Sequence, residues 1–193
     1  KYRPKTCPGR LVVGRGGATC NHVFDRYGQV LHEVTAPGLA DLYGVGIDRH
    51  DKLYVMSAAT RIVGGRPYYD RLTGTLLKLD PESSRVLTTS KQVPYALAEA
   101  NCLNRSKDIV SAMQGAAWVE DAEWLYGGVG FGGKNPGNGC ACWNARFALD
   151  YLARSFVPEI DRYSVAVLDS AGNVVTRIGT YGNADDGRPL VAD

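Results

Sequence analysis

The sequence lacks the short motifs that identify the common hydrolytic and redox enzymes. Its 193 residues contain no Gly-x-Ser-x-Gly nucleophile elbow, no His-Glu-x-x-His zinc motif and no recognisable Ser-His-Asp arrangement. There is no Cys-x-x-Cys pair either, so thioredoxin-like redox chemistry and c-type haem attachment lack their motif. The sequence therefore supports no specific catalytic mechanism.

The charges are nearly balanced and form no long run of one sign. Lysines and arginines number 22 against 20 acids, which gives a net charge of +2 at pH 7. Nucleic-acid-binding proteins usually concentrate basic residues in a patch or stripe, so this composition argues against a nucleic-acid partner. No apolar run reaches the roughly 18 residues that a membrane-spanning helix requires, so we expect no membrane span.

Short strands dominate what is present, and residues 146–179 show them best. This segment divides into RFALD, RSFVPE, YSVAVLD and NVVTRIG. The last two are joined by residues 169–173, DSAGN, whose residue types tolerate left-handed backbone or cap a turn with their own side chains. Four short antiparallel strands make a unit of the size of a propeller blade, which cannot bury both of its faces alone.

Parts of this unit recur elsewhere in the chain. Residues 44–56 and 115–130 repeat its opening frame, in which an apolar strand ends in an acid and a polar turn leads to a second strand. The closing hairpin at residues 168–174 recurs at 24–30 and 79–86, where an aspartate ends one strand and a β-branched residue begins the next. These partial copies together predict an all-β repeat protein.

In these segments the chain resembles the NHL-type β-propellers, a six-bladed family. The resemblance is carried by Gly46-Ile47-Asp48 with Leu53-Tyr54-Val55, by Leu77-Lys78-Leu79-Asp80 and by residues 165–179. It implies blades of four-stranded antiparallel sheets, of which this chain would hold about three and a half to four. We therefore expect residues 1–193 to form a single propeller domain or a fragment of one, with a smaller four-bladed ring as the alternative.

Two insertions interrupt the expected blades, at residues 57–74 and 127–144. The first contains Arg66, Tyr68 and Tyr69, an aromatic and arginine composition that is common in recognition sites. We predict that these side chains bind a ligand. The alternative is a solvated loop that packs on its own blade.

The second insertion is rich in glycine and so cannot be a regular strand throughout. It is either a flexible excursion or a shaped loop whose backbone approaches another group closely. Trp143, Asn144 and Arg146 lie at its end, and we add them to the predicted binding residues. Here the alternative is a surface loop held by a disulfide.

The five cysteines allow disulfides or buried thiols, and they are Cys7, Cys20, Cys102, Cys140 and Cys142. Cys7 could pair with Cys20, and Cys102 with Cys140 or Cys142, but sequence alone does not fix the connectivity. An odd count leaves one thiol free or intermolecular.

A metal is the alternative role for some of these cysteines. Cys20 with His22, and Cys140 with Cys142, each place two soft ligands two positions apart, on one face of a strand. Thiolate and imidazole ligands suit zinc or copper.

Three acids suggest a different metal site. Asp48, Glu120 and Asp150 occupy equivalent positions at strand ends, so their carboxylates could surround one end of a propeller channel. Such a ring could bind calcium or support general acid/base chemistry. Acids at strand ends also cap turns, and this is the interpretation we favour.

Two classes of function are compatible with these features. The first is a binding or scaffold propeller that recognises a protein, peptide or glycan through its loops and channel mouth, which we prefer because catalytic motifs are missing. The second, which the family resemblance allows, is a metal-dependent hydrolase or lyase on a six-bladed propeller.

The cysteine content and the propeller class favour a secreted or periplasmic location. A partial ring would expose sheet edges and an apolar face, so further chains or subunits are expected partners as well.

Overall fold

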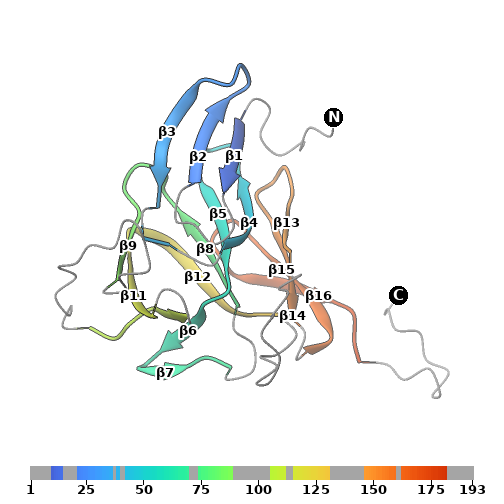
Figure 1. Cartoon of the computed structure of the whole chain (residues 1–193). Coiled ribbons are helices and arrows are strands. Elements are labelled where there is room, and N and C mark those ends of the chain that lie inside the picture. The colour runs from blue at the N-terminus through green and yellow to red at the C-terminus, as the bar shows by residue number, and fades with distance from the viewer. Residues whose placement is uncertain are drawn as a thin grey trace, which may run out of the picture.

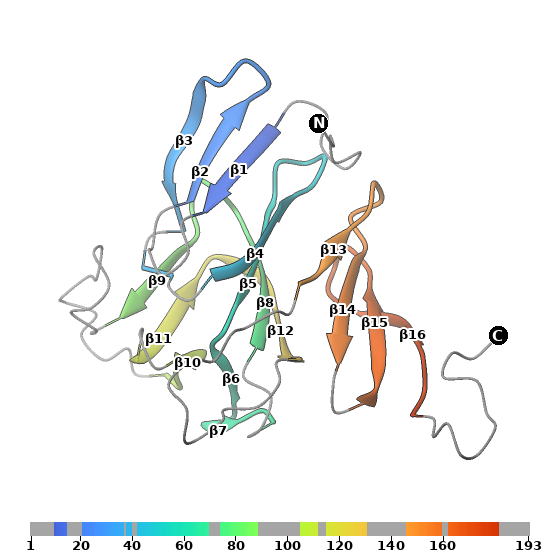
Figure 2. The same ribbon diagram turned by 45° about the vertical axis from the view of Figure 1, so that its right-hand side comes forward.

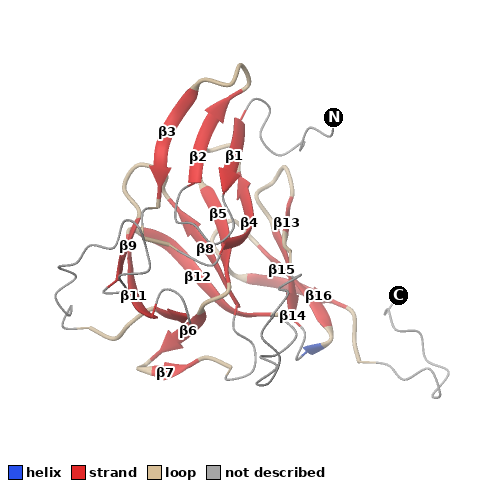
Figure 3. Ribbon diagram, viewed as in Figure 1, coloured by secondary structure: helices blue, strands red, loops and turns tan. Residues whose placement is uncertain are grey.

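The computed structural model describes residues 10–14, 21–36, 38–39, 42–69, 74–88, 105–111, 115–130, 146–159 and 162–181. Strands dominate these ranges, with one short helical turn just before the strand that begins at Ser164 (Figures 1 and 3). Across the same ranges, no helix has the length and apolar character needed to cross a membrane.

The strands, in chain order, are β1 (Arg10–Gly14), β2 (Asn21–Asp25), β3 (Val30–Thr35), β4 (Leu42–Ile47), β5 (Leu53–Ser57), β6 (Thr60–Val63), β7 (Arg66–Pro67), β8 (Gly74–Leu79), β9 (Arg85–Thr88), β10 (Ile109–Ser111), β11 (Gly115–Glu120), β12 (Ala122–Val129), β13 (Ala148–Leu149), β14 (Ser155–Glu159), β15 (Ser164–Leu168) and β16 (Val174–Ile178).

These strands form four antiparallel sheets. The middle sheet has the order β12-β8-β5-β4, the five-stranded sheet β7-β6-β10-β11-β9, the C-terminal sheet β13-β14-β15-β16 and the N-terminal sheet β1-β2-β3. Figure 2 shows the middle sheet between the five-stranded and C-terminal sheets, with the N-terminal sheet beyond one of its ends. The predicted fold class is confirmed, because the described chain is all-β and includes four-stranded antiparallel sheets of blade size.

The middle sheet is buried on both faces, which explains the nearly unbroken apolar sequences of β5 and β8. Successive side chains point to opposite faces, so each strand contributes to two cores. The core toward the five-stranded sheet includes Leu53, Val55, Leu77, Val86 and Ile109. The core toward the C-terminal sheet includes Met56, Leu76, Val157, Ala166 and Leu168. Each fully buried aliphatic side chain contributes about 1.5–3 kcal/mol, so these two cores hold the three layers together.

The C-terminal sheet confirms the four strands predicted within residues 146–179. β13, β14, β15 and β16 pair in chain order, with β14 and β15 in register from Ser155↔Leu168 to Glu159↔Ser164. This simple meander arises because each connection between its strands is short.

One turn geometry recurs at the aspartates that end β2, β4, β13 and β15, which are Asp25, Asp48, Asp150 and Asp169. The backbone N–H of each donates to the carbonyl four residues later, and each Oδ1 accepts N–H groups from two and four residues later. The residue three positions after each aspartate has a left-handed φ, and these residues are Gly28, Asp51, Ala153 and Gly172. The aspartates therefore cap their own turns, as short polar side chains do.

Two of the predicted hairpins are wrong. β8 and β9, predicted to pair across residues 79–86, belong to different sheets, and so do β11 and β12 within residues 115–130. Ser84 supplies the reason. Its Oγ accepts the backbone N–H of Asp80 at 2.8 Å and donates to the carbonyl of Asp121 at 2.7 Å. The two turns are thus bonded to each other, and both chain segments pass between the middle and five-stranded sheets.

The residues of the two predicted insertions occupy different positions in the structure. β5 and β8 pair directly, and the residues between them contribute β6 and β7 to the five-stranded sheet. Residues 127–129 still belong to β12, whereas residues 131–145, most of the second predicted insertion, lie outside the described ranges.

Candidate functional site

Tyr68 and Tyr69, two of the residues predicted to bind a ligand, directly follow β7. Their rings lie edge to face, with centroids 4.6 Å apart and planes at 79°. Tyr68 is 42% exposed, so this pair meets solvent. Tyr69 has a φ of 61°, a left-handed conformation that is uncommon for an aromatic residue.

Two glycines at the end of β12 make room for these rings. A Cβ atom on Gly127 would lie 2.9 Å from Tyr68 Cδ1, and one on Gly128 would lie 3.0 Å from Tyr69 Cδ2. Both glycines begin the second predicted insertion, for which one of the two alternatives was a loop whose backbone approaches another group closely. The tyrosine pair is one such group, and only glycine leaves space for it.

Arg162 reaches the tyrosine pair from the C-terminal sheet, 93 residues farther along the chain than Tyr69. Its Nη2 donates to Tyr69 Oη at 2.7 Å, and its Cζ lies 6.0 Å from the Tyr69 ring centroid. The Arg162 side chain is 45% exposed, so the guanidinium is held at the surface. We call Tyr68, Tyr69 and Arg162, with the Glu159 carboxylate beneath them, the tyrosine–arginine cluster.

Glu159 anchors the cluster from the end of β14 with a side chain that is only 6% exposed. Its Oε2 accepts from Arg177 Nε at 2.7 Å, and its Oε1 accepts from Tyr126 Oη at 2.6 Å. Arg162 Nε lies 3.7 Å from the same carboxylate. Two arginines thus share the carboxylate of Glu159.

The pKa shifts of Glu159, Tyr126 and Arg162 determine which of these groups are charged at neutral pH. Burial raises the pKa of Glu159, but hydrogen bonds from Arg177 and Tyr126 outweigh burial and hold the pKa below its usual value. Burial and the Glu159 carboxylate both raise the pKa of the Tyr126 hydroxyl. The hydrogen bond to Tyr69 raises the pKa of Arg162. Glu159 is therefore ionised, Tyr126 is a neutral donor and Arg162 is a cation.

This arrangement suits binding better than chemistry. The carboxylate of the cluster is buried and occupied by three donors, so it is poorly placed to take a proton from a ligand. The groups that meet solvent are a phenol ring and a guanidinium, which contribute contact area, hydrogen bonds and positive charge.

The remaining predicted binding residues are placed only in part. Arg66 is exposed in β7, two positions before Tyr68, and Arg146 is exposed just before β13. Trp143 and Asn144 lie outside the described residues. The structure therefore brings Tyr68 and Tyr69 together and places Arg66 on the same hairpin.

The three acids predicted as a calcium ring are separately engaged. Asp48 Oδ2 accepts from Tyr54 Oη at 3.2 Å, Glu120 Oε2 accepts from Arg85 Nε at 2.7 Å, and Asp150 Oδ2 accepts from Arg154 Nε at 2.6 Å. Throughout the described ranges, no three His, Cys, Asp or Glu side chains converge as metal ligands would. The structure thus does not bring these carboxylates together.

The other predicted metal ligands fall mostly beyond the described ranges. Cys20, Cys140 and Cys142 are not described, nor are Cys7 and Cys102. His22 is described in β2, half-buried, with its ring centroid 6.2 Å from that of Phe24.

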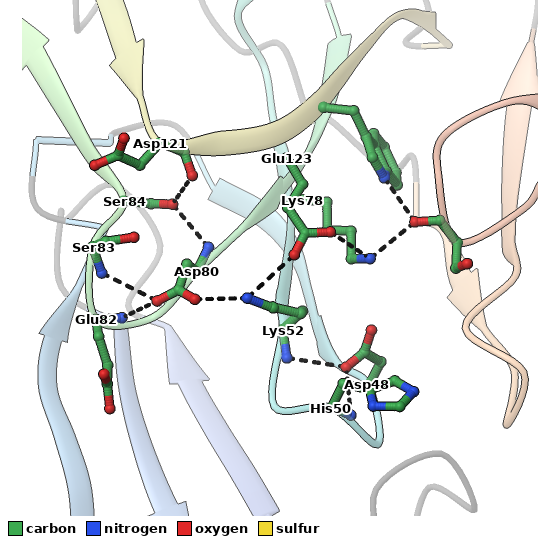
Figure 4. Close-up of polar contacts among 12 residues, drawn as sticks. Asp48, His50, Lys52, Lys78, Asp80, Glu82, Ser83, Ser84, Asp121 and Glu123 are labelled. Atoms are coloured by element: carbon green, nitrogen blue, oxygen red, sulfur yellow. Dashed lines mark hydrogen bonds and ion pairs between the residues drawn. The ribbon is translucent and has the colours of Figure 1, made fainter.

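A second polar cluster lies at one end of the middle sheet, and we call it the lysine network (Figure 4). Lys52 Nζ lies 2.6 Å from Asp80 Oδ2 and 3.2 Å from Glu123 Oε1, while Lys78 Nζ lies 2.7 Å from Glu123 Oε2. Hydrogen bonds from Lys52 and from the backbone of the adjacent turn lower the pKa of Asp80 to about 2.

The lysine network fixes one sheet on another. The Lys78 side chain is 8% exposed, and its Nζ donates to the carbonyl of Ser170 at 2.9 Å. Trp124 Nε1 donates to the same carbonyl at 3.1 Å. Because Ser170 belongs to the turn between β15 and β16, these bonds hold the C-terminal sheet against the middle sheet. The network is therefore structural, and the tyrosine–arginine cluster is the candidate site.

Sequence reasoning missed Glu159, Arg162 and Tyr126. None of them lies in a motif, and the chain holds many other arginines and tyrosines. Their contacts join segments far apart in the sequence, so no local pattern could have identified them.

No model of a known protein family matches the chain, and a comparison with curated proteins gives no match either. Function must therefore be inferred from the geometry of the cluster.

Proposed function

We propose that this protein is a binding module that recognises a protein, peptide or glycan through the tyrosine–arginine cluster and the neighbouring loops. The observation that carries the proposal is the meeting of Tyr68, Tyr69 and Arg162, which come from separate sheets and hold one another at the surface. Tyrosine and arginine are enriched among residues that dominate binding energy, because they combine large contact area with polar tips.

The cluster is also preorganised. Glu159 fixes Arg177 directly and lies close to Arg162, and Gly127 and Gly128 leave a fitted space for the rings. A group that is already ordered loses less conformational entropy when a ligand binds. Tyr69, which accepts a hydrogen bond from Arg162, has a left-handed φ of 61°, and such strained residues are concentrated at functional sites.

The wider setting of the proposal is a propeller-type scaffold of the NHL kind in a secreted or periplasmic protein. The blade-sized C-terminal meander supports the scaffold, and the five cysteines support an oxidising compartment. Loops at the end of a rigid sheet are common places for recognition residues.

The test is to expose the immobilised protein to a phage library of random 12-residue peptides and to a glycan array. We expect at least one ligand class to be retained, and Tyr68→Ala to reduce that binding at least about tenfold, the effect of roughly 1.4 kcal/mol. Tyr151→Ala is the matched control, because Tyr151 is also an exposed tyrosine (55%, against 42% for Tyr68) and does not belong to the cluster. Capture of no ligand, or equal loss in both variants, would refute the proposal.

A further inference from the structure

The C-terminal sheet packs on the middle sheet through only one of its two faces. Val157, Ala166 and Leu168 belong to the core that these two sheets share. Because side chains alternate along a strand, their neighbours in sequence point to the opposite side of the sheet, which we call the outer face. Figure 2 shows the C-terminal sheet at the end of the stack of sheets, and no described strand lies beyond it.

The outer face has no charged side chain within β14, β15 and β16. The only charged residues of these strands, Glu159 and Arg177, point to the core-facing side and bond to each other at 2.7 Å. On the outer face Val165 is 36% exposed and Ile178 is 47% exposed, whereas Val167 at the centre is 4% exposed. The cross-strand pairs of this face are Phe156↔Val167, Pro158↔Val165, Val165↔Ile178 and Val167↔Thr176.

β15 has the sequence of a strand that is buried on both faces. Residues 165–168, VAVL, are apolar without interruption, and the strands that most resemble them are β5 and β8 of the middle sheet. Both of those strands contribute to a core on each side. An antiparallel strand with one side in water usually alternates apolar and polar residues instead. The outer face therefore has the composition of a surface that a further sheet covers.

We infer that the outer face binds the outer face of a second copy of this chain, in a dimer with two-fold symmetry. Two antiparallel sheets then pack face to face, as the C-terminal and middle sheets do within one chain. The tyrosine–arginine cluster is anchored by Glu159, which points to the other side of the sheet. This interface thus goes beyond the proposed function and does not depend on it.

The lack of charge favours a second copy over a partner of a different kind. A two-fold interface places a patch against itself, so a charged patch would repel its own copy. The strands of the outer face carry no such charge. A partner recognised through opposite charge would find nothing to pair with on these strands, whereas an identical apolar face meets no repulsion.

The area of the outer face predicts a weak dimer. β14, β15 and β16 have five residues each, so together they cover roughly 240 Å², at about 4.8 Å between strands and about 3.3 Å per residue. A standard specific interface buries about 800 Å² per partner, and smaller interfaces belong to transient complexes. We therefore expect monomer and dimer in exchange, with a Kd between about 10 µM and 1 mM.

The experiment is sedimentation velocity on the whole chain from about 10 µM to 1 mM, the range of the expected Kd. Free thiols are first blocked with iodoacetamide, so that a disulfide between chains cannot account for association. The average mass should rise with concentration from that of one chain toward that of two. The association should not weaken when sodium chloride is raised from about 0.05 to 0.5 M, because it does not depend on charge.

Val165→Glu should weaken dimerisation at least about tenfold, because it places a charge in the apolar centre of the interface on both copies. Ile178→Lys, at the cross-strand position, should have a similar effect with a charge of the opposite sign. Val30→Glu is the matched control, because Val30 is a 46% exposed strand valine in the N-terminal sheet. Its Kd for dimerisation should stay within about twofold of the original value. Circular dichroism shows whether each variant is folded.

A chain that stays monomeric at about 1 mM would overturn the inference, and so would a dimer that weakens as salt is raised. Unchanged dimerisation of folded Val165→Glu and Ile178→Lys, or equal weakening by Val30→Glu, would overturn it as well. Species that grow beyond the dimer would show that the outer face binds a different surface of the next copy, which contradicts a two-fold interface. None of these results bears on the tyrosine–arginine cluster, which ligand retention tests separately.

Discussion

At the scale of single residues, Glu159 is the buried charge that holds the candidate site in shape. Two arginines and a phenol depend on its carboxylate, which is 6% exposed. Buried charges are stable only when paired, so the surroundings of Glu159 are more sensitive to substitution than those of a surface acid.

Glu159→Gln should lower the free energy of unfolding by about 2–3 kcal/mol, because it leaves Arg177 without its counter-charge. The loss stays below that of a fully buried ion pair, since Arg177 is 38% exposed and water solvates the remaining charge. Urea unfolding at pH 7 measures this change. Glu120→Gln, which breaks the more exposed pair with Arg85, should cost clearly less. Equal losses in the free energy of unfolding would show that burial does not make the Glu159 ion pair more stabilising than the exposed one.

The sequence predicted Tyr68 and Tyr69 as binding residues, because aromatic residues with arginines are common in recognition loops. The structure places both in the candidate cluster, and their role in binding stays a prediction. Arg162 was missed because nothing local distinguishes it from Arg154, an arginine of similar exposure on the same sheet. Only its contact with Tyr69 sets it apart.

At the scale of elements, the aspartate turns show how one local geometry serves different tertiary contexts. Gly28 and Gly172 occupy the same position of the same turn, and both have a φ of 84°. A Cβ on Gly28 would meet no atom within 4 Å, whereas one on Gly172 would lie 2.8 Å from the Trp124 ring. The second turn is therefore docked on the middle sheet, and the first faces open space.

Gly28→Ala should lower the free energy of unfolding by about 1 kcal/mol, the cost of a left-handed L-residue. Gly172→Ala carries the same backbone cost and also displaces Trp124, so its loss should exceed that of Gly28→Ala by about 1–2 kcal/mol. Parallel urea unfolding of the two variants isolates the docking contribution. If both variants lose the same stability, the turn does not depend on its contact with Trp124.

The strands also differ in how well their pairing can be predicted from the local sequence. The strands of the C-terminal sheet pair with their neighbours in sequence, so their hairpins were predicted correctly. β8 and β9 look locally like another hairpin, because an aspartate and a polar turn separate two apolar segments. They do not pair, because the Ser84 side chain bonds the turn to Asp121, which is 37 positions away in the sequence.

At the scale of the whole molecule, carboxylates that are stabilised in the folded state make stability depend on pH. The pKa of Asp80 is lowered to about 2 by hydrogen bonds from Lys52 and the adjacent turn, and the pKa values of Glu123 and Glu159 are also lowered. In the unfolded chain these groups titrate near pH 4. The unfolded state therefore binds more protons as the pH falls.

The free energy of unfolding should accordingly hold steady above about pH 5 and decrease as the pH falls from there toward 2. Urea unfolding at pH 7, 5, 4 and 3 measures the profile. Asp80→Asn should be less stable than the original protein at pH 7 but should lose less on acidification, since it has no proton to take up at that position. A flat profile for the original protein, or identical slopes for both proteins, would contradict this account.

Properties that depend on neighbours along the chain follow from the sequence alone. β-branched residues in short runs, separated by Asp, Gly and Asn, specify strands and capped turns locally, which is why the all-β class and the C-terminal meander could be predicted. Tertiary structure alone decided which sheet each strand joins, and it alone brought Arg162 to Tyr69 across 93 positions of sequence. These contacts join segments that are distant in the sequence, through burial on both faces of the middle sheet and through the bonds of Ser84, Lys78 and Glu159. Local sequence patterns do not encode such contacts.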